Sequence, residues 1–258
     1  MQKLDYLHLD IQGDIAEITL DRPAKRNALN DPLIETLHHY FLTMPDSVKA
    51  IIIHANGDNF SAGLDLSELT ERNTIEGVMH SMSWHKAFEC IEYAKAPVIS
   101  VLKGAVVGGG LELACATHVR VAEPSTYYAL PEGQRGIFVG GGAAVRVPRL
   151  IGTSRMADMM LTGRVIKAEE GERIGLSNYA VDEGKGLEKA RELAAKIAKN
   201  SPVTNFAVIQ ALPRIAEANP GQAFMMESLM AAIAQGSDQA KAALQAFLNK
   251  QAKKVTEL

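Results

Sequence analysis

Apolar and polar residues alternate along the first part of the chain in a way that predicts strands. Residues 7–23, LHLDIQGDIAEITLDRP, alternate with a period of two on both sides of Gly13 and Asp14. Successive side chains of a strand point to opposite faces, and glycine and aspartate favour turns, so this stretch predicts a β-hairpin. The apolar runs KAIIIHANG (49–57) and PVISVL (97–102) are typical of short buried strands.

Other segments show helical spacing. Asp31 and Pro32 place a capping residue before a proline in the first turn, which predicts a helix that runs to about Met44. Residues 74–94 carry apolar and aromatic groups at helical spacing and predict a second long helix. From Lys185 onward the pattern is almost entirely helical.

Strands that alternate with helices along a chain are typical of an α/β fold. We therefore expect an α/β core over residues 1–198 that contains the functional site. Residues 199–258 are expected to form a helical C-terminal region.

Composition narrows the classes of function. The 258 residues are 47% hydrophobic and 22% charged, with a formal net charge of −3, as in ordinary globular proteins. This balance favours neither nucleic acid nor an anionic membrane as a partner. No apolar run approaches the ~18 residues of a membrane span, and the N-terminus lacks the pattern of a secretory signal. Cys90 and Cys115 lie far apart, which disfavours a disulfide framework, so a cytoplasmic protein is expected.

A cluster of three glycines, Gly108 to Gly110, lies between an apolar strand and the helix-forming run LELACA. The first N–H groups of a helix lack partners within the helix, and glycine lets a ligand oxygen approach them closely. Such a corner can hold an oxyanion, and a nearby carboxylate such as Glu112 or Glu132 can transfer protons. A simple glycine turn with a surface glutamate accounts for the same residues, so both interpretations stay open on this segment alone. Its spacing matches neither a phosphate-binding loop nor a nucleophile elbow.

Five segments, taken in order, carry a resemblance to a known family. They are LDRPAKRNALN, FSAGLDLSEL, KGAVVGGGLELA, LPEGQRGIFVGGGAAVRVPRLIG and LTGRVIKAEEGERIGLSNYAV. With them the chain resembles the crotonase superfamily, and within it the enoyl-CoA hydratases, along nearly its whole length. The resemblance implies a crotonase-like spiral of repeated ββα units, with a C-terminal helical trimerisation region at 199–258. It also implies an acyl-CoA thioester as substrate and a homotrimer, or a homohexamer of paired trimers.

The resemblance assigns an oxyanion hole and two catalytic carboxylates. The oxyanion hole would consist of the backbone N–H groups of Leu64 and Gly109. Glu112 would orient and deprotonate water and Glu132 would deliver a proton to the α-carbon, with shared or reversed roles as the alternative in a coupled pair. The presence of both glutamates favours hydration of a 2-enoyl-CoA. Isomerisation, thioester hydrolysis and C–C cleavage through the same enolate are the alternatives, as is a non-catalytic binding protein.

Residues at two places match positions that contact coenzyme A in the family. The first are Lys25 and Arg26, for which a solvated pair of turn charges is the alternative. The second belong to the loop that carries the first oxyanion amide, namely Ala62, Asp65 and Leu66. The alternative for Asp65 is a cap on the helix that begins around Ser67.

The acyl pocket is the part about which the sequence says least. By the resemblance, its lining residues are Trp84, Phe88, Pro131, Val139 and Gly140. An aromatic stripe on a helix is more often part of the core, which is the alternative for Trp84 and Phe88. Val139 stands where the family commonly has proline, so the pocket is expected to be altered or small. His80 and His85 are not at metal-ligand spacing, so no metal is expected. No cofactor is expected either, because coenzyme A is part of the substrate.

Overall fold

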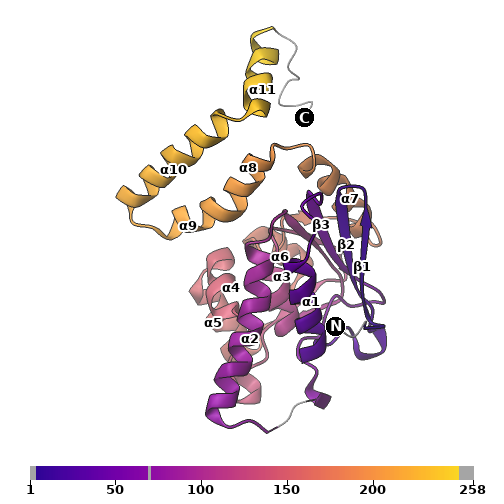
Figure 1. Ribbon diagram of the computed structural model, residues 1–258. Helices are drawn as coiled ribbons and strands as arrows, with labels where there is room; N and C mark the ends of the chain where they lie inside the picture. The colour runs from indigo at the N-terminus through magenta and orange to yellow at the C-terminus, as the bar shows by residue number, and fades with distance from the viewer. Residues whose placement is uncertain (1–3, 69–70, 250–258) are drawn as a thin grey trace. The chain divides into compact units, whose positions relative to one another are not determined.

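The structure is a computed structural model that describes residues 4–68 and 71–249 (Figure 1). The chain divides into two compact units, Met1–Ala198 and Lys199–Leu258. All strands of the described residues lie in the first unit, whereas the second consists of helices. The cavity that holds most of the predicted site residues lies entirely within the first unit.

The hairpin predicted at the start of the chain is confirmed. Strand β1 (Leu7–Gln12) pairs antiparallel with β2 (Ile15–Leu20). Between them Gly13 takes a φ of 64°, which glycine adopts without steric cost. Alternate residues of β2 are buried, as the period of two requires.

From β2 onward the large sheet is parallel. Its order is β1-β2-β3-β4-β6-β9. The parallel neighbours are β3 (Ala50–Ala55), β4 (Val98–Leu102), β6 (Val119–Ala122) and β9 (Tyr179–Ala180). Strands β3 and β4 occupy the apolar runs 49–57 and 97–102, so both predicted strands are confirmed.

A second sheet has three strands, in the order β5-β7-β8. They are β5 (Ala105–Val107), β7 (Tyr127–Ala129) and β8 (Ile166–Lys167). In the consecutive pairs β4–β5 and β6–β7, the first strand joins the large sheet and the second joins the small one. Helix α3 (Gly109–Ala116) follows the first pair and α4 (Ala143–Ile151) follows the second, which is the repeated ββα pattern that was expected.

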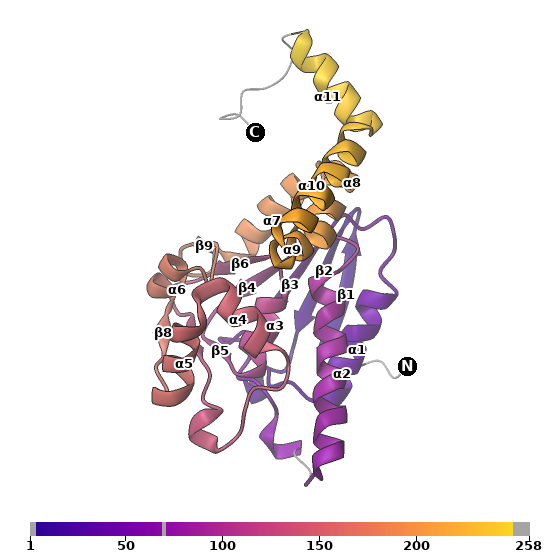
Figure 2. The ribbon, with the colours of Figure 1, turned by 90° about the vertical axis from the view of Figure 1, so that its left-hand side faces the viewer.

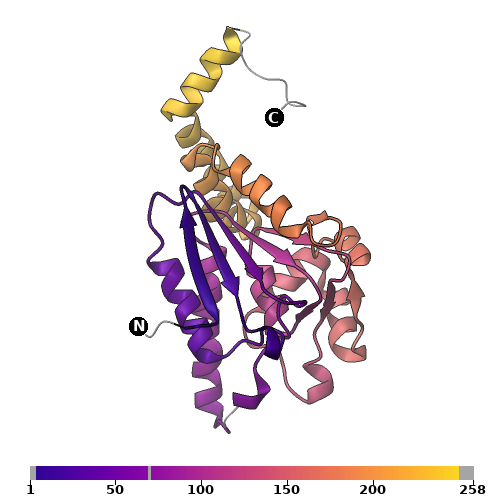
Figure 3. The same ribbon diagram turned by 90° about the vertical axis from the view of Figure 1, so that its right-hand side faces the viewer.

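Helices cover both faces of the large sheet. On β3, Ile51 and Ile53 pack into the cluster that contains residues of α1 (Asp31–Leu42), α2 (Thr74–Glu92) and α3, the side seen in Figure 2. Ile52 packs on the opposite side with residues of α7 (Gly186–Ile197), and Figure 3 views the sheet from that side. Strands buried on both faces read as continuous apolar runs, which accounts for the sequence KAIIIHA.

The start of α1 differs in detail from the prediction. The cap is Asn30, whose side chain accepts a hydrogen bond from the backbone N–H of Leu33 at 3.2 Å, so Asp31 is the first helical residue and not the cap. The helix ends at Leu42 rather than Met44. Helix α2 begins at a capping box that Asn73 forms with Glu76.

The remaining helices of the first unit are α5 (Thr153–Thr162) and α6 (Ala168–Ile174). Short 3₁₀ turns occur at η1 (Pro23–Lys25), η2 (Leu66–Glu68) and η3 (Gly133–Arg135).

The second unit is helical throughout its described part. Its segments are α8 (Pro202–Phe206), η4 (Ala207–Ala211, a π-helical turn), α9 (Leu212–Glu217), α10 (Pro220–Gln235) and α11 (Asp238–Leu248). Asn219 caps α10 and Ser237 caps α11, and each side chain accepts a hydrogen bond from a backbone N–H of the first turn. Within the described residues, no helix combines the length and apolar character needed to cross a membrane.

Candidate active site

A cavity of about 430 Å³ holds most of the predicted site residues. Its walls come from the loop before η2, from α2, from the N-terminus of α3, and from residues 131–141 after β7. A larger cavity of about 500 Å³ lies among His54, Lys103 and Glu183 and contains none of the predicted site residues.

The parallel pairing of β5 with β7 explains how two glutamates far apart in sequence reach one cavity. Val107, at the end of β5, pairs with Ala129, at the end of β7. The N–H of Gly108 donates to the carbonyl of Ala129 at 2.9 Å, which extends this alignment past the strand ends. Glu112 and Glu132 follow within a few residues, and both line the cavity.

The two predicted oxyanion amides are neighbours. A β-carbon placed on Gly109 would lie 3.5 Å from the backbone nitrogen of Leu64. Within the described part of the chain, neither N–H group donates a hydrogen bond to another protein atom. Both residues line the cavity, so the structure leaves two adjacent backbone donors for a ligand oxygen.

Glycine at position 63 makes this closeness possible. Its φ is 88°, and a β-carbon there would lie 2.6 Å from the carbonyl oxygen of Val107. The loop is fixed against β5 by the hydrogen bond from the N–H of Ser61 to the carbonyl of Ala105, at 2.8 Å. A larger residue at 63 would move the Leu64 amide away from Gly109.

Glu112 lies in the first turn of α3 and is buried, with 4% of its surface exposed. Its Oε1 accepts hydrogen bonds from the N–H groups of Gly141, at 2.8 Å, and Ala143, at 3.1 Å. Burial raises the pKa of Glu112, and these two N–H groups oppose that rise together with the charges of His85 and Arg146.

Glu132 follows β7 and is partly buried. Its Oε2 is buried without a hydrogen-bond partner among the described residues. Burial raises the pKa of Glu132, and the nearby charge of Glu112 raises it further. Two carboxyl groups with raised pKa values on one cavity can carry protons to and from a ligand.

Four of the five predicted acyl-pocket residues line the cavity, namely Trp84, Pro131, Val139 and Gly140. The Trp84 ring lies against the oxyanion corner, since its Cζ3 would be 3.0 Å from a β-carbon on Gly109. Phe88 does not line the cavity. It is fully buried behind Trp84, with the two rings edge to face and their centroids 5.7 Å apart. For Phe88 the structure therefore favours the core alternative.

The predicted coenzyme A residues divide into two groups. Ala62 and Leu66 line the cavity, whereas Lys25, Arg26 and Asp65 do not. Arg26 is exposed, and its carbonyl accepts a hydrogen bond from the N–H of Ala62 at 2.9 Å, which anchors the loop.

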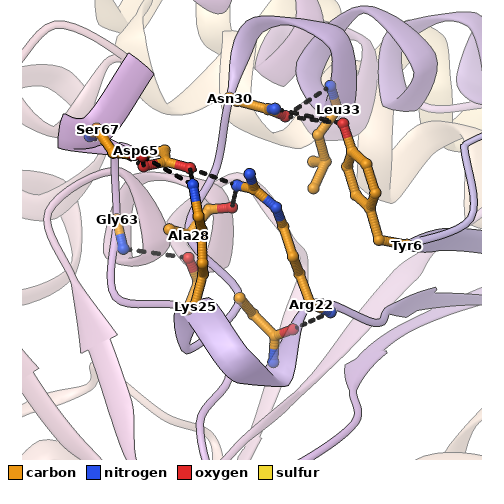
Figure 4. A network of polar contacts seen from close by, with 11 residues as sticks. Tyr6, Arg22, Lys25, Ala28, Asn30, Leu33, Gly63, Asp65 and Ser67 are labelled. Atoms are coloured by element: carbon orange, nitrogen blue, oxygen red, sulfur yellow. Dashed lines mark hydrogen bonds and ion pairs between the residues drawn. The ribbon is translucent and has the colours of Figure 1, made fainter. Parts of the chain in front are cut away.

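Asp65 is the centre of a polar network (Figure 4). Its Oδ2 accepts hydrogen bonds from Arg22 Nη1 at 2.6 Å and Lys25 Nζ at 2.9 Å. Its Oδ1 accepts from the N–H of Ser67 at 3.0 Å, which confirms the capping alternative. Burial alone would raise the pKa of Asp65, but the hydrogen bonds from Ser67, Lys25 and Arg22 hold it well below its usual range.

The sequence did not indicate the role of Asp31. Its Oδ1 pairs with His80 Nε2 at 2.7 Å and accepts from Trp84 Nε1 at 3.1 Å, and Oδ2 pairs with Arg72 at 3.2 Å. All three partners line the cavity, so Asp31 fixes that wall from outside it. Its place before a proline suggested only a cap, and the real cap at Asn30 is what frees its carboxylate. Among the described residues, no cluster of His, Cys, Asp and Glu is arranged to hold a metal ion.

Known proteins are similar in sequence to this chain over most of its length. Residues 10–257 match the sequence profile of the family described as enoyl-CoA hydratase/isomerase. The short-chain-enoyl-CoA hydratase of Clostridium acetobutylicum is 32% identical over 251 residues, which cover 96% of each protein. The carnitinyl-CoA dehydratase of Salmonella enteritidis is 35% identical over 200 residues, or 76% of each protein.

Solved structures agree with the architecture. A protein structure from Rhodopseudomonas palustris CGA009 is 58% identical, with a TM-score of 0.93 over 95% of both chains. The enoyl-CoA hydratase from Bacillus anthracis is 28% identical, with a TM-score of 0.89, over 97% of this chain and 98% of that one. Sequence profile, relatives and fold thus coincide over nearly the whole chain, which has the crotonase fold and belongs to the enoyl-CoA hydratase/isomerase family.

Proposed function

We propose that this protein is a hydro-lyase that adds water across the 2,3 double bond of a 2-enoyl-CoA thioester to give a 3-hydroxyacyl-CoA. The oxygen of water bonds to the β-carbon and a proton bonds to the α-carbon, while negative charge develops on the thioester oxygen. Family membership supports this reaction class. So do relatives that match nearly the whole chain and are named enoyl-CoA hydratases.

One observation carries the proposal. Two carboxyl groups and two adjacent backbone N–H groups, those of Leu64 and Gly109, converge on a single cavity. The amide pair is suited to the thioester oxygen as it becomes negative, and loss of one such donor typically costs about 3 kcal/mol of transition-state stabilisation. The carboxyl pair provides the base and the acid that water addition requires.

The surroundings of the two carboxyl groups support distinct roles. Two N–H groups hold Glu112 Oε1, which leaves Oε2 to accept a proton from water. Glu132 has a raised pKa and a buried oxygen without a partner among the described residues, which suits a group that carries a proton to the α-carbon. We therefore assign Glu112 as the base and Glu132 as the acid.

Coenzyme A enters the proposal as part of the substrate, with no further cofactor. Ala62 and Leu66 border the cavity, beside Lys25 and Arg26 on the neighbouring turn. Arg26 makes no side-chain hydrogen bond within the described part of the chain, which supports a role for it at the phosphates. The expected cytoplasmic location remains a prediction.

A homotrimer or homohexamer is also part of the proposal. Large apolar side chains are exposed along the helices of the second unit, including Phe206, Phe224, Met225, Leu229, Ile233 and Phe247. Apolar surface of this kind typically marks a protein interface.

The test is loss of the enoyl-thioester absorbance on adding the protein to a panel of 2-enoyl-CoA esters, with products identified by mass. A gain of one water on any ester would establish hydration, and the fastest ester would identify the acyl group. Binding of the esters without water addition would exclude hydration in favour of isomerisation, thioester hydrolysis or C–C cleavage. Failure to bind any CoA ester would refute the proposal altogether.

A further inference from the structure

The position of the Glu112 carboxylate depends on a run of three glycines, Gly140 to Gly142. The N–H of Gly141 donates to Glu112 Oε1 at 2.8 Å, and the N–H of Ala143, next after the run, donates at 3.1 Å. Glycine has the greatest backbone freedom of any residue, so consecutive glycines do not by themselves hold a peptide group in one orientation. The carbonyl of Gly142 accepts hydrogen bonds from the N–H groups of Val145 and Arg146, which orients the Ala143 N–H, so the Gly141 N–H is the one that a side chain has to orient.

Ser81, on α2, provides one such anchor. Its Oγ donates to the carbonyl oxygen of Gly140 at 2.6 Å. That carbonyl and the N–H of Gly141 belong to the same peptide group, which is planar and places them on opposite sides. Fixing the carbonyl towards Ser81 therefore directs the N–H towards Glu112.

Arg146, on α4, anchors the next peptide group. Its Nη1 donates to the carbonyl oxygen of Gly141 at 3.2 Å, and its guanidinium pairs with Glu92 at 2.7 Å. Arg146 also acts on Glu112 through its charge. Ser81 is neutral, so its effect on Glu112 can be separated from a direct charge effect.

We propose that Ser81 is a positioning residue, which holds the Gly140–Gly141 peptide in the orientation that keeps Glu112 Oε1 bound and Oε2 available for water. The proposal rests on the proposed function in one respect, the assignment of Glu112 as the base. Ser81 lines the cavity, and the contact that carries this role is its hydrogen bond to the Gly140 carbonyl. Its importance comes from the flexibility of the glycines that it restrains.

Two substitutions test the hydroxyl group. Ser81→Ala removes it, and Ser81→Thr retains a hydroxyl on the same β-carbon. Alanine is a better helix former than serine, so a loss of activity in Ser81→Ala does not come from a weaker α2. We expect Ser81→Ala to lower kcat about tenfold, the effect of losing one well-placed hydrogen bond, with little change in KM. Ser81→Thr should restore most of kcat.

The pH dependence of kcat distinguishes this role from a general loss of structure, which would lower kcat without shifting its pH profile. Without Ser81 the Gly141 N–H can turn away, and Glu112 loses a donor that lowers its pKa. The acid limb of kcat should therefore shift to higher pH in Ser81→Ala. The charged groups that face Glu112 are His85 on α2, Arg146 on α4 and Glu132 after β7. None of the Ser81 substitutions alters these residues.

Two control variants isolate the contact between Ser81 and Gly140. Ser83 lies on the same helix, and within the described structure its Oγ bonds only the carbonyl of His80 in the turn before it, at 2.7 Å. Ser83→Ala should therefore leave kcat and the pH profile unchanged. Ser81 Oγ is also 3.5 Å from His85 Nε2. In a His85→Asn background, Ser81→Ala should still lower kcat and shift the acid limb to higher pH. If Ser81→Ala has no further effect in that background, the hydroxyl acts through His85 and the peptide route is overturned.

Titration of Glu112 by carboxyl ¹³C NMR, assigned with Glu112→Gln, separates this inference from the proposed function. A higher Glu112 pKa in Ser81→Ala, restored in Ser81→Thr, supports the positioning role even if the protein hydrates no ester. If the wild type hydrates an ester but Ser81→Ala leaves kcat, the acid limb and the Glu112 titration unchanged, the positioning role is wrong. Equal impairment in Ser81→Ala and Ser81→Thr overturns it as well.

Discussion

Glu112 and Glu132 face one cavity but are held in different ways. Glu112 has one oxygen fixed by two backbone N–H groups, whereas Glu132 has a buried oxygen without a partner in the described structure. Burial raises the pKa of both. A carboxylate that is fixed and one that is free to receive or deliver a proton form the asymmetric pair that general acid–base catalysis uses.

Each glutamate should be needed for turnover. Glu112→Gln and Glu132→Gln keep the shape of the side chain but remove proton transfer, so kcat should fall by about 10²–10⁴. Binding of a CoA ester, measured by calorimetry, should change little. Glu89→Gln, at an exposed position of α2, is the control and should behave as wild type. Near wild-type turnover in either site variant would contradict the two-carboxylate mechanism.

The raised pKa of Glu132 also predicts a cost in stability. A carboxyl group whose pKa is raised by folding binds its proton more tightly in the folded state, so its contribution to stability is lost as pH rises through the folded pKa. Glu132→Gln removes the charge and should be more stable than wild type at neutral pH. The difference in unfolding free energy, followed by urea denaturation, should narrow as pH falls through the raised pKa. A constant difference across that range would argue against a buried, destabilised carboxylate.

At the scale of elements, hydrogen bonds to neighbouring segments hold the loop of residues 61–65, which carries the Leu64 amide. The carbonyl oxygen of Gly63 accepts a hydrogen bond from the N–H of Leu29 at 2.8 Å, and the carbonyl of Leu29 accepts from the N–H of Asp65 at 2.8 Å. Asp65 adds the link to the turn η1 through Arg22 and Lys25 (Figure 4). The Leu64 amide therefore depends on a partly buried set of ion pairs outside the cavity.

Asp65→Asn should weaken both the fold and the reaction. It removes the buried charge that accepts hydrogen bonds from Arg22 and Lys25, which should cost about 3 kcal/mol of unfolding free energy at neutral pH. Because folding lowers the pKa of Asp65, its contribution is present above the ordinary aspartate pKa and is lost only as pH falls through the lower folded value. Asp46→Asn breaks an exposed pair with Lys95 and should have almost no effect in the same denaturation assay. Equal stability of the two variants would show that the Asp65 network does not hold the loop.

At the scale of the whole molecule, the sequence predicts the fold class and the residues that motifs identify. Periodicity located the hairpin, β3, β4 and α2, because each is a local pattern of burial. Glu112, Glu132, Leu64 and Gly109 were named from motifs, and the structure brings them to one cavity. Their assigned roles remain to be tested.

Contacts between distant segments could not be predicted. Ser81 and Gly140 are separated by 59 residues, and Asp31 and Trp84 by 53. The helical pattern of α2 does not show whether an aromatic residue faces the cavity, as Trp84 does, or the core behind it, as Phe88 does. Such distinctions depend on how α2 packs against α3 and the glycine run, which no local pattern records.

The assembly state is a prediction at this scale. Light scattering after size exclusion should give a mass three or six times the 27.8 kDa of one chain. Phe224→Glu together with Leu229→Glu places charges on exposed apolar positions of α10 and should reduce the assembled mass. Gln222→Glu, an exposed polar position of the same helix, should not. A monomeric wild type would refute the oligomer.

Four of the donors at this cavity belong to the main chain: the N–H groups of Leu64 and Gly109, and those of Gly141 and Ala143 that hold Glu112. A main-chain N–H survives every substitution of its own residue except proline. Mutation can therefore vary Ile137 or Val139 without deleting a donor. Substitutions at such positions can change the preferred acyl group while the main-chain donors, and with them the reaction, are kept. These positions are therefore suitable for a mutant library aimed at new acyl groups.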